Sequence, residues 1–223
     1  MASERTIRAA VVVAAAACCL AACDPAAEAP RNDGFTPPER SLPSRIAPTG
    51  VPTYTAWAGP GCTTDTDYRE HGRFENGDAA WYTVPSGGHR DDSCDGRFTA
   101  LPMSGDPDRD GPSTVTWTWP VGTSYERCAL AVFIPDGPRD IDVAGNPTIY
   151  RILTNPDDDP SSAYAAFGIH QPRHRGTLVE VGTYEVRSST FTVLLTDRGR
   201  DWGDASLVGA HHGAGQMKLR CEG

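Results

Sequence analysis

The chain has 223 residues and a formal net charge of −9. This acidic balance disfavours nucleic acid and anionic lipid headgroups as partners, because both are themselves negatively charged. The basic side chains are nearly all arginine, and Lys218 is the single lysine of the chain.

The N-terminus has the pattern of a bacterial signal peptide. Arg5 and Arg8 precede an apolar run over residues 9–22, which is too short to span a membrane because a spanning helix needs about 20 residues. The run closes with Leu20, Ala21, Ala22 and Cys23. This ending resembles the lipobox of bacterial lipoproteins, in which the cysteine receives a diacylglyceryl group and the chain is cut just before it. The resemblance implies a lipid anchor on Cys23, at the outer face of the cytoplasmic membrane. An ordinary cleaved signal peptide with a chance cysteine is the alternative.

Residues 23–52 have the composition of a disordered tether. They are Pro, Ala, Arg and acidic residues, with almost no large apolar side chain. Such a segment cannot bury enough apolar surface to offset its ordering entropy. The sequence therefore predicts a signal peptide over residues 1–22, a Pro-rich tether over 23–52 and a single folded domain over 53–223.

Four cysteines lie beyond Cys23, and an even number in an exported chain indicates disulfides. Cys62 and Cys94 lie in loops rich in Gly and Asp, whereas Cys128 begins one predicted strand and Cys221 ends another. We therefore predict the pairs Cys62–Cys94 and Cys128–Cys221. A zinc site is the alternative, but no two of these cysteines have the close spacing that zinc sites favour.

Strand patterns dominate the folded part. Residues 113–121 alternate Thr with Val and Trp, so Trp117 and Trp119 share one face, which is more often core than a sugar platform. Other strands are predicted at residues 128–134, 148–153, 163–169, 177–181, 183–186, 191–195 and 216–221. Residues 53–103 are interpreted as the opening strands of the same unit. Short strands at regular spacing predict an all-β fold, an antiparallel β-sandwich of jelly-roll type held by disulfides.

Four of these stretches resemble a known family. They are 113–121 (STVTWTWPV), 128–135 (CALAVFIP), 179–186 (VEVGTYEV) and 191–197 (FTVLLTD). Their order and spacing are similar to those of the golvesin C-terminal-like domain, itself similar to the carbohydrate-binding module of xanthan lyases. The resemblance implies a β-sandwich that binds polysaccharide or cell-surface material, in a lipoprotein of actinobacterial type. The chain departs from the family at residues 169–171, at residues 210–213 and in its four cysteines.

Residues 106–111 (DPDRDG) have the form of a calcium-binding loop. Alternate carboxylates of Asp106, Asp108 and Asp110 can converge on one Ca²⁺ ion. The twelfth position, however, is Trp117 rather than the usual Glu. A solvated acidic turn explains the same residues, so both interpretations stay open, and no other cofactor is predicted.

The ligand site is predicted around an exposed aromatic side chain. Trp202 lies in a polar loop with Asp201 and Asp204, which can fix sugar hydroxyls while the indole contacts the sugar ring. Tyr164 and His170 are weaker candidates for the same site. The histidines at 170, 174, 211 and 212 are predicted to lie at the surface.

No catalytic motif is found: the chain has no G-x-S-x-G, no H-E-x-x-H and no phosphate-binding loop. The predicted function is therefore a non-enzymatic, membrane-anchored binding module for glycan or a cell-envelope protein, on the extracytoplasmic side. An envelope polysaccharide hydrolase with a pair of carboxylates is one alternative. A structural subunit of a membrane complex is the other.

Overall fold

The computed structural model describes residues 53–77, 79–155 and 159–223. The predicted signal peptide, the lipid-anchored Cys23 and the tether lie outside the described residues. In the described part, no helix is long and apolar enough to cross a membrane.

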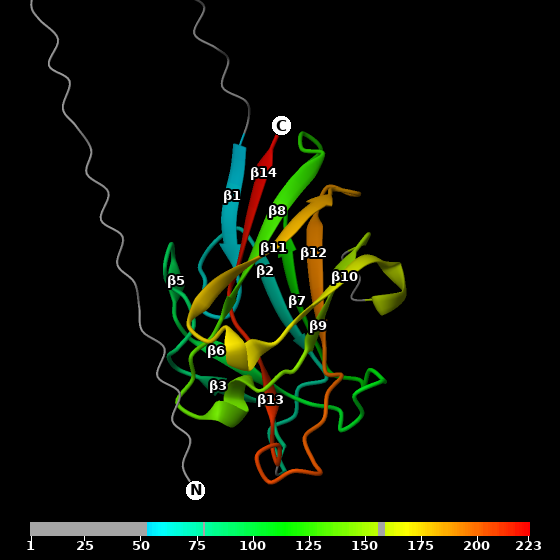
Figure 1. Ribbon diagram of the computed structural model, residues 1–223. Helices are drawn as coiled ribbons and strands as arrows, with labels where there is room; N and C mark the ends of the chain where they lie inside the picture. The colour runs from blue at the N-terminus through cyan, green and yellow to red at the C-terminus, as the bar shows by residue number, and fades with distance from the viewer. Residues whose placement is uncertain (1–52, 78, 156–158) are drawn as a thin grey trace, which may run out of the picture. The chain divides into compact units, whose positions relative to one another are not determined.

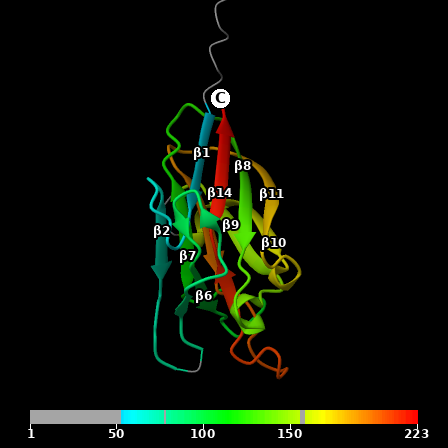
Figure 2. The ribbon, with the colours of Figure 1, turned by 90° about the vertical axis from the view of Figure 1, so that its left-hand side faces the viewer.

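Two antiparallel sheets form the two layers of the domain (Figures 1 and 2). The four-stranded sheet has the order β1 (Thr53–Ala58), β14 (Met217–Glu222), β8 (Arg127–Ile134) and β11 (Thr177–Glu185). The five-stranded sheet has the order β10 (Ala163–Ile169), β9 (Thr148–Leu153), β12 (Phe191–Thr196), β7 (Thr114–Trp119) and β2 (Asp67–His71). The predicted all-β antiparallel sandwich is confirmed.

Eight of these strands follow the order of a jelly roll. From β7 the chain crosses to β8 in the other sheet, returns to β9 and its neighbour β10, crosses to β11, returns to β12 and finishes in β14. The first strand, β1, lies beside the last, β14, with Thr53 opposite Glu222. The first described strand therefore begins beside the end of the last one. The edge strand β2 extends the larger sheet beside β7.

The remaining strands lie outside the two layers. They form a three-stranded sheet of β13 (His211–Ala214), β6 (Phe98–Pro102) and β3 (Tyr82–Val84), and a hairpin of β4 (Arg90–Asp91) and β5 (Cys94–Asp95). The described helices are single 3₁₀ turns: η1 (Asp140–Val143), η2 (Pro160–Ser162) and η3 (Gln171–Arg173). The prediction for residues 53–103 was therefore right for β1 and β2. It was wrong for β3 and β6, which pair with β13 instead of joining the sandwich.

The core lies between the two sheets and confirms the predicted inward face of β7. Trp117 and Trp119 are fully buried, and their indole N–H groups donate to the carbonyls of Gly215, at 3.0 Å, and Ala56, at 3.2 Å. Buried polar groups are stable only when hydrogen-bonded, so these two contacts also fix the rings in one orientation.

The strands predicted from periodicity agree closely with the structure. Residues 148–153 and 163–169 form β9 and β10 with the expected bounds. The two strands predicted at residues 177–181 and 183–186 are one strand, β11, interrupted by a register shift between Glu180 and Gly182. This β-bulge explains the break in the alternation, because one extra residue moves the following side chains to the other face.

Both predicted disulfides are confirmed: Cys62 pairs with Cys94, and Cys128 pairs with Cys221. Cys128 and Cys221 are directly opposite each other on β8 and β14, and both are fully buried. Cys62 and Cys94 are partners in an isolated β-bridge. Each disulfide therefore joins neighbouring extended segments.

The prediction of surface histidines was wrong for His211 and His212, which are 2% and 0% exposed. Both lie on β13 and face opposite ways. The His211 ring packs against Tyr82, and the His212 ring nitrogens contact the Thr148 hydroxyl and the Arg198 carbonyl. Histidine tolerates such burial when both nitrogens have hydrogen-bond partners. His170 and His174 are exposed, as predicted.

Candidate binding groove

The outer face of the four-stranded sheet is set by alternation along its strands. On β14, Met217, Leu219 and Cys221 are buried in the core, so the intervening Lys218 and Arg220 face outward. On β8, the same alternation turns two alanines outward. The register places Ala131 opposite Lys218 and Ala129 opposite Arg220.

The neighbouring strand β11 contributes outward-facing residues on the other side of β8, and each of them extends a row of side chains that runs across the sheet. Glu180 is opposite Ala131, and Thr183 is opposite Ala129. The β-bulge lies between these two positions, with Gly182 at a φ of +133°, a conformation that favours glycine. The bulge keeps both Glu180 and Thr183 on the outer face even though they are three residues apart.

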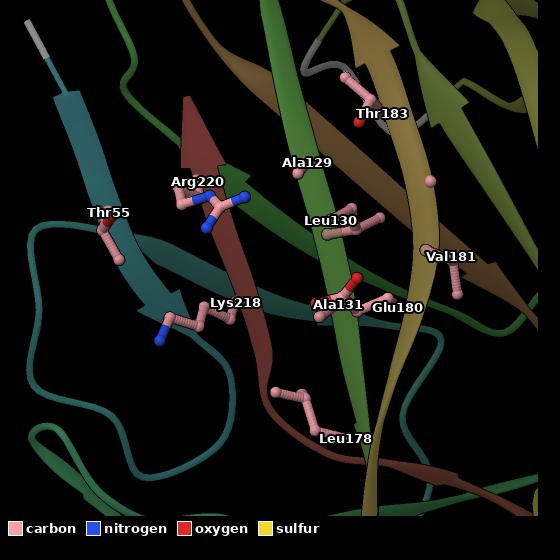
Figure 3. A pocket seen from close by; sticks show the side chains of 11 residues that line it. Thr55, Ala129, Leu130, Ala131, Leu178, Glu180, Val181, Thr183, Lys218 and Arg220 are labelled. Carbon is pink, nitrogen blue, oxygen red and sulfur yellow. The ribbon is translucent and has the colours of Figure 1, made fainter. Parts of the chain in front are cut away.

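These rows form a groove whose floor is β8 (Figure 3). The two alanines carry one methyl group each, whereas the side chains on both flanking strands are longer, so the middle of the sheet is hollow. The hollow measures about 610 Å³. We call this surface the outer groove, defined by its lining side chains Thr55, Ala129, Ala131, Leu178, Glu180, Thr183, Lys218 and Arg220.

The outer groove continues past both ends of this hollow. A second hollow of about 540 Å³ shares Thr55 and Lys218 with it and extends over β1 toward Asp65 and Asp92. A third of about 160 Å³ shares Arg220 and leads toward the end of β14. The three hollows adjoin one another through these shared lining residues, an arrangement that suits an extended ligand better than a compact one.

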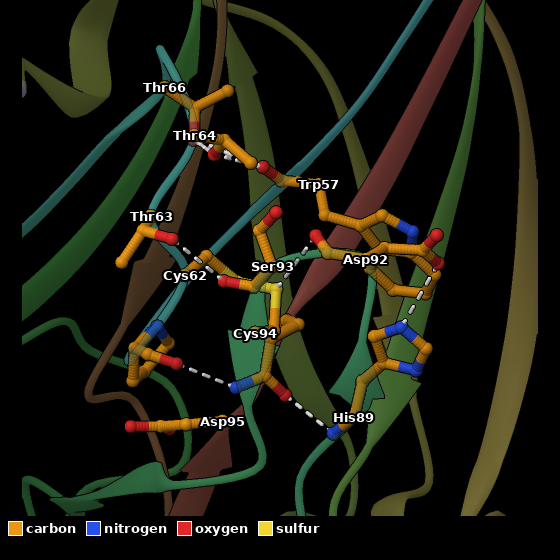
Figure 4. Close-up of a disulfide and its surroundings, with 12 residues drawn as sticks. Trp57, Cys62, Thr63, Thr64, Thr66, His89, Asp92, Ser93, Cys94 and Asp95 are labelled. Atoms are coloured by element: carbon orange, nitrogen blue, oxygen red, sulfur yellow. Dashed lines mark hydrogen bonds and ion pairs between the residues drawn. A yellow bond between two sulfur atoms is a disulfide. The ribbon is translucent and has the colours of Figure 1, made fainter.

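Trp57 lines the second hollow, and its side chain lies beside His89 and Asp92 (Figure 4). Its ring stacks on His89, with centroids 3.8 Å apart and planes 9° apart, and the Lys218 ammonium lies 5.5 Å from the ring centroid. The His89 ring is also 3.4 Å from the Asp92 carboxylate. Trp57 is only 6% exposed, so it supports the wall rather than offering a free aromatic face.

The Cys62–Cys94 disulfide holds the turn that carries Asp92 (Figure 4). The two-residue turn between β4 and β5, Asp92 and Ser93, has φ values of +49° and +72°. Positive φ at both positions is what a type I′ hairpin turn requires. The Ser93 carbonyl accepts a hydrogen bond from the Thr63 N–H at 2.9 Å, which joins this turn to the residue after Cys62.

Tyr54 lines the second hollow, and the pKa of its hydroxyl is raised. Burial raises the pKa of the Tyr54 hydroxyl, and the negative charge of Asp65 raises it further. Tyr54 therefore stays protonated at neutral pH and can donate a hydrogen bond to a ligand in the groove.

The residues predicted for the ligand site lie elsewhere. Trp202 is 58% exposed, as predicted, and its indole N–H donates to the Gly105 carbonyl at 2.6 Å. Asp201 is half-buried beside the same glycine. Asp204 accepts hydrogen bonds from the backbone N–H and hydroxyl of Ser206, both at 2.8 Å, within its own loop.

The two weaker candidates contact other segments. The Tyr164 hydroxyl, on β10, donates to the Glu185 carbonyl, and the Arg187 guanidinium lies 4.1 Å from its ring centroid. The His170 ring contacts the Asn146 side chain. Among the described residues, no hydrogen bond joins Tyr164 or His170 to the Trp202 loop. The hydrogen bonds of the described residues therefore do not join the five predicted residues into one site.

The three aspartates of the predicted calcium loop make separate contacts. Asp110 binds Arg151 at 2.6 Å and Arg198 at 2.9 Å, while one Asp106 oxygen accepts the Asp108 backbone N–H at 2.9 Å. In the described part of the chain, no group of three or more His, Cys, Asp or Glu side chains is placed to hold a metal ion. The interpretation as an acidic turn held by arginines fits these contacts.

Comparisons with protein-family models, with curated proteins and with solved structures found no match for this chain. The resemblance to the golvesin C-terminal-like domain therefore stays a prediction from short sequence stretches.

Sequence reasoning did not find the outer groove. Two signals pointed toward it: Lys218 is the single lysine, and it lies in an alternating strand at the end of the chain. The floor is set by cross-strand register, which brings together residues 55, 129–131, 178–183 and 218–220 from distant parts of the sequence.

Proposed function

We propose that this protein is a non-enzymatic binding module that captures a glycan in the outer groove. A lipid on Cys23 holds the module at the outer face of the cytoplasmic membrane. The observation that carries the proposal is the groove itself: adjoining hollows on the outer face of one sheet, the first of which has two alanines on its floor and polar side chains on both sides of them.

The lining chemistry supports a sugar ligand. Thr55, Thr183 and Glu180 can exchange hydrogen bonds with hydroxyl groups, and the methyl groups of Ala129 and Ala131 can contact the apolar C–H faces of sugar rings. This recognition rests on hydrogen bonds along the groove, because the Trp57 ring is covered by His89. Each contact is weak, so retention at a surface depends on many copies on one membrane.

Filling the floor of the groove tests this assignment. Ala131→Leu replaces one methyl group by a branched side chain on the floor of the first hollow, and we expect the affinity for glycan to fall at least about tenfold. Ala131 is only 8% exposed, so the larger side chain should also lower the stability, by about 1–3 kcal/mol, and the binding loss is read at a temperature at which the variant is folded. Isothermal titration calorimetry and thermal unfolding measure the two effects.

Ala166→Leu is the matched control, since Ala166 is an exposed alanine on β10 of the other sheet. It should leave glycan affinity unchanged. If Ala131→Leu binds as tightly as the wild type, the groove is not the site. Release of reducing sugar by the wild-type protein would instead favour the hydrolase alternative.

The anchor makes a separate prediction. Cys23→Ala removes the thiol that the lipobox resemblance assigns to lipidation, so the protein should shift from the membrane fraction to the soluble fraction or stay unprocessed. Immunoblots of fractionated cells follow the shift, and intact-mass analysis of the wild type should show a lipidated Cys23. A mature wild-type protein with an unmodified N-terminus elsewhere contradicts the anchor.

A further inference from the structure

Some cationic side chains of the domain form close ion pairs with carboxylates, and others do not. Most described arginines contact a carboxylate within 3.2 Å. These pairs are Arg69–Asp67, Arg73–Glu70, Arg97–Asp95, Arg139–Asp142, Arg151–Asp110, Arg175–Asp136, Arg187–Glu185 and Arg198–Asp110. In the outer groove, within the described residues, Lys218 forms no ion pair and Arg220 has only Glu222, at 3.7 Å. Arg90, Arg127, Arg173 and Arg200 also form no ion pair among the described residues, so the groove is marked by two such cations on adjacent outward positions of one strand.

The two cations lie side by side on one wall. Lys218 and Arg220 are alternate outward residues of β14, so their backbone positions are about 7 Å apart along the strand. Lys218 is half-buried between Trp57 and the alanine floor. Partial burial reduces the screening of its charge by water, which strengthens its attraction for an anion in the groove.

The opposite wall carries the complementary chemistry. Glu180 and Thr183 on β11 face the two cations across the alanines (Figure 3). A carboxylate repels anions and accepts hydrogen bonds from hydroxyl groups. A ligand with both anionic groups and hydroxyl groups would therefore lie in one orientation, with its anionic groups against β14 and its hydroxyls against β11.

We infer that the ligand of the outer groove is an anionic glycan, a sugar chain that bears carboxylate or phosphate groups. This inference rests on the proposed function and names the class of glycan. The guanidinium of Arg220 can bind either anion through two parallel hydrogen bonds, and the ammonium of Lys218 supplies a second positive charge for the next substituent along the chain.

The acidity of the rest of the protein sharpens this selectivity. With a formal net charge of −9, the surface as a whole repels polyanions. Binding of an acidic chain therefore depends on the cations of the groove, which are Lys218 and Arg220 together with Arg127 at the third hollow, and indiscriminate accumulation of polyanions elsewhere on the molecule is unfavourable.

Matched pairs of polymers test the inference on the full-length protein in mild detergent. One pair is polygalacturonate and its carboxyl-reduced, neutral form; the other is phosphomannan and its dephosphorylated form. We expect the charged member of at least one pair to bind about tenfold more tightly than its neutral partner. The pair that shows the difference identifies the anion as carboxylate or phosphate.

Single-residue variants test whether the preference for the charged polymer comes from the outer groove. Lys218→Gln and Arg220→Gln should each weaken binding of the charged polymer about tenfold and leave the neutral polymer unaffected, while Lys218→Arg should retain most of the affinity. Arg69→Gln is the control, because it removes the same charge from an exposed residue of β2 in the other sheet. Because Arg220 is exposed, its variant keeps the test valid if Lys218→Gln unfolds.

The outcomes separate the inference from the proposed function. Equal binding of charged and neutral polymers overturns the anionic class and leaves glycan binding in place. The same holds if Arg69→Gln weakens binding as much as Arg220→Gln, since the attraction is then not specific to the groove. Failure to bind any of the four polymers overturns the inference, and failure on a wider glycan array overturns the proposed function as well.

Discussion

Replacing Cys128 and Cys221 together by alanine is expected to lower the free energy of unfolding by about 4.6 kcal/mol. The disulfide closes a loop with a sequence separation of 93 residues, and a cross-link over such a loop restricts the unfolded chain strongly. Both cysteines are fully buried on central strands, so the variant also loses core contacts. Urea unfolding followed by tryptophan fluorescence measures the loss.

The second disulfide provides the comparison. Cys62→Ala with Cys94→Ala opens a loop with a separation of 32 residues, for which the same reasoning gives about 3.7 kcal/mol. It also frees the turn that carries Asp92 beside the second hollow. A loss below about 1 kcal/mol for the Cys128 and Cys221 variant would contradict the structural role assigned to that cross-link.

Acidification is expected to destabilise the fold through His212. Burial lowers the pKa of its imidazole to about 4. The Nε2–H donates to the Arg198 carbonyl and Nδ1 accepts from the Thr148 hydroxyl, so the neutral ring is fully satisfied. In the unfolded chain the pKa returns to about 6.5.

The direction in which stability changes with pH depends on whether the folded or the unfolded state binds the proton. Between about pH 6.5 and pH 4 the unfolded chain binds a proton at His212 and the folded domain does not, so stability falls as the pH falls through this range. The expected loss is about 3 kcal/mol. Denaturant midpoints measured at several pH values follow it.

His212→Gln is the matched variant, because an amide can offer both a donor and an acceptor without titrating. Its stability should be lower at neutral pH but should change much less between pH 6.5 and pH 4. Equal pH dependence in both proteins would show that another group titrates. The aspartates with lowered pKa values, among them Asp110, lose their favourable contribution only below about pH 4.

Much of the sandwich could be predicted because its inner strands alternate strongly. Residues 114–119 place two tryptophans on one face, and residues 128–134 are nearly all apolar. The disulfide pairing also followed from where the cysteines lie relative to the strands. These are local properties, visible in a window of a few residues.

Other features depend on contacts that no short window contains. β13 has only the residues His-His-Gly-Ala, which show no strand pattern, and its burial is caused by pairing with β6 and by packing against Tyr82. The outer groove depends on the register of four strands and on one bulge. Its alanine floor looked like ordinary core sequence, because both alanines lie within the apolar run of β8.

The central claim is that the outer groove binds glycan without cleaving it. The most direct measurement incubates the full-length protein, in detergent, with an array of envelope polysaccharides, and records both saturable binding and the release of reducing ends. We expect binding to at least one polysaccharide, loss of that binding in Ala131→Leu and no reducing ends over a long incubation. Release of reducing ends, or the absence of binding to every polysaccharide on the array, would contradict it.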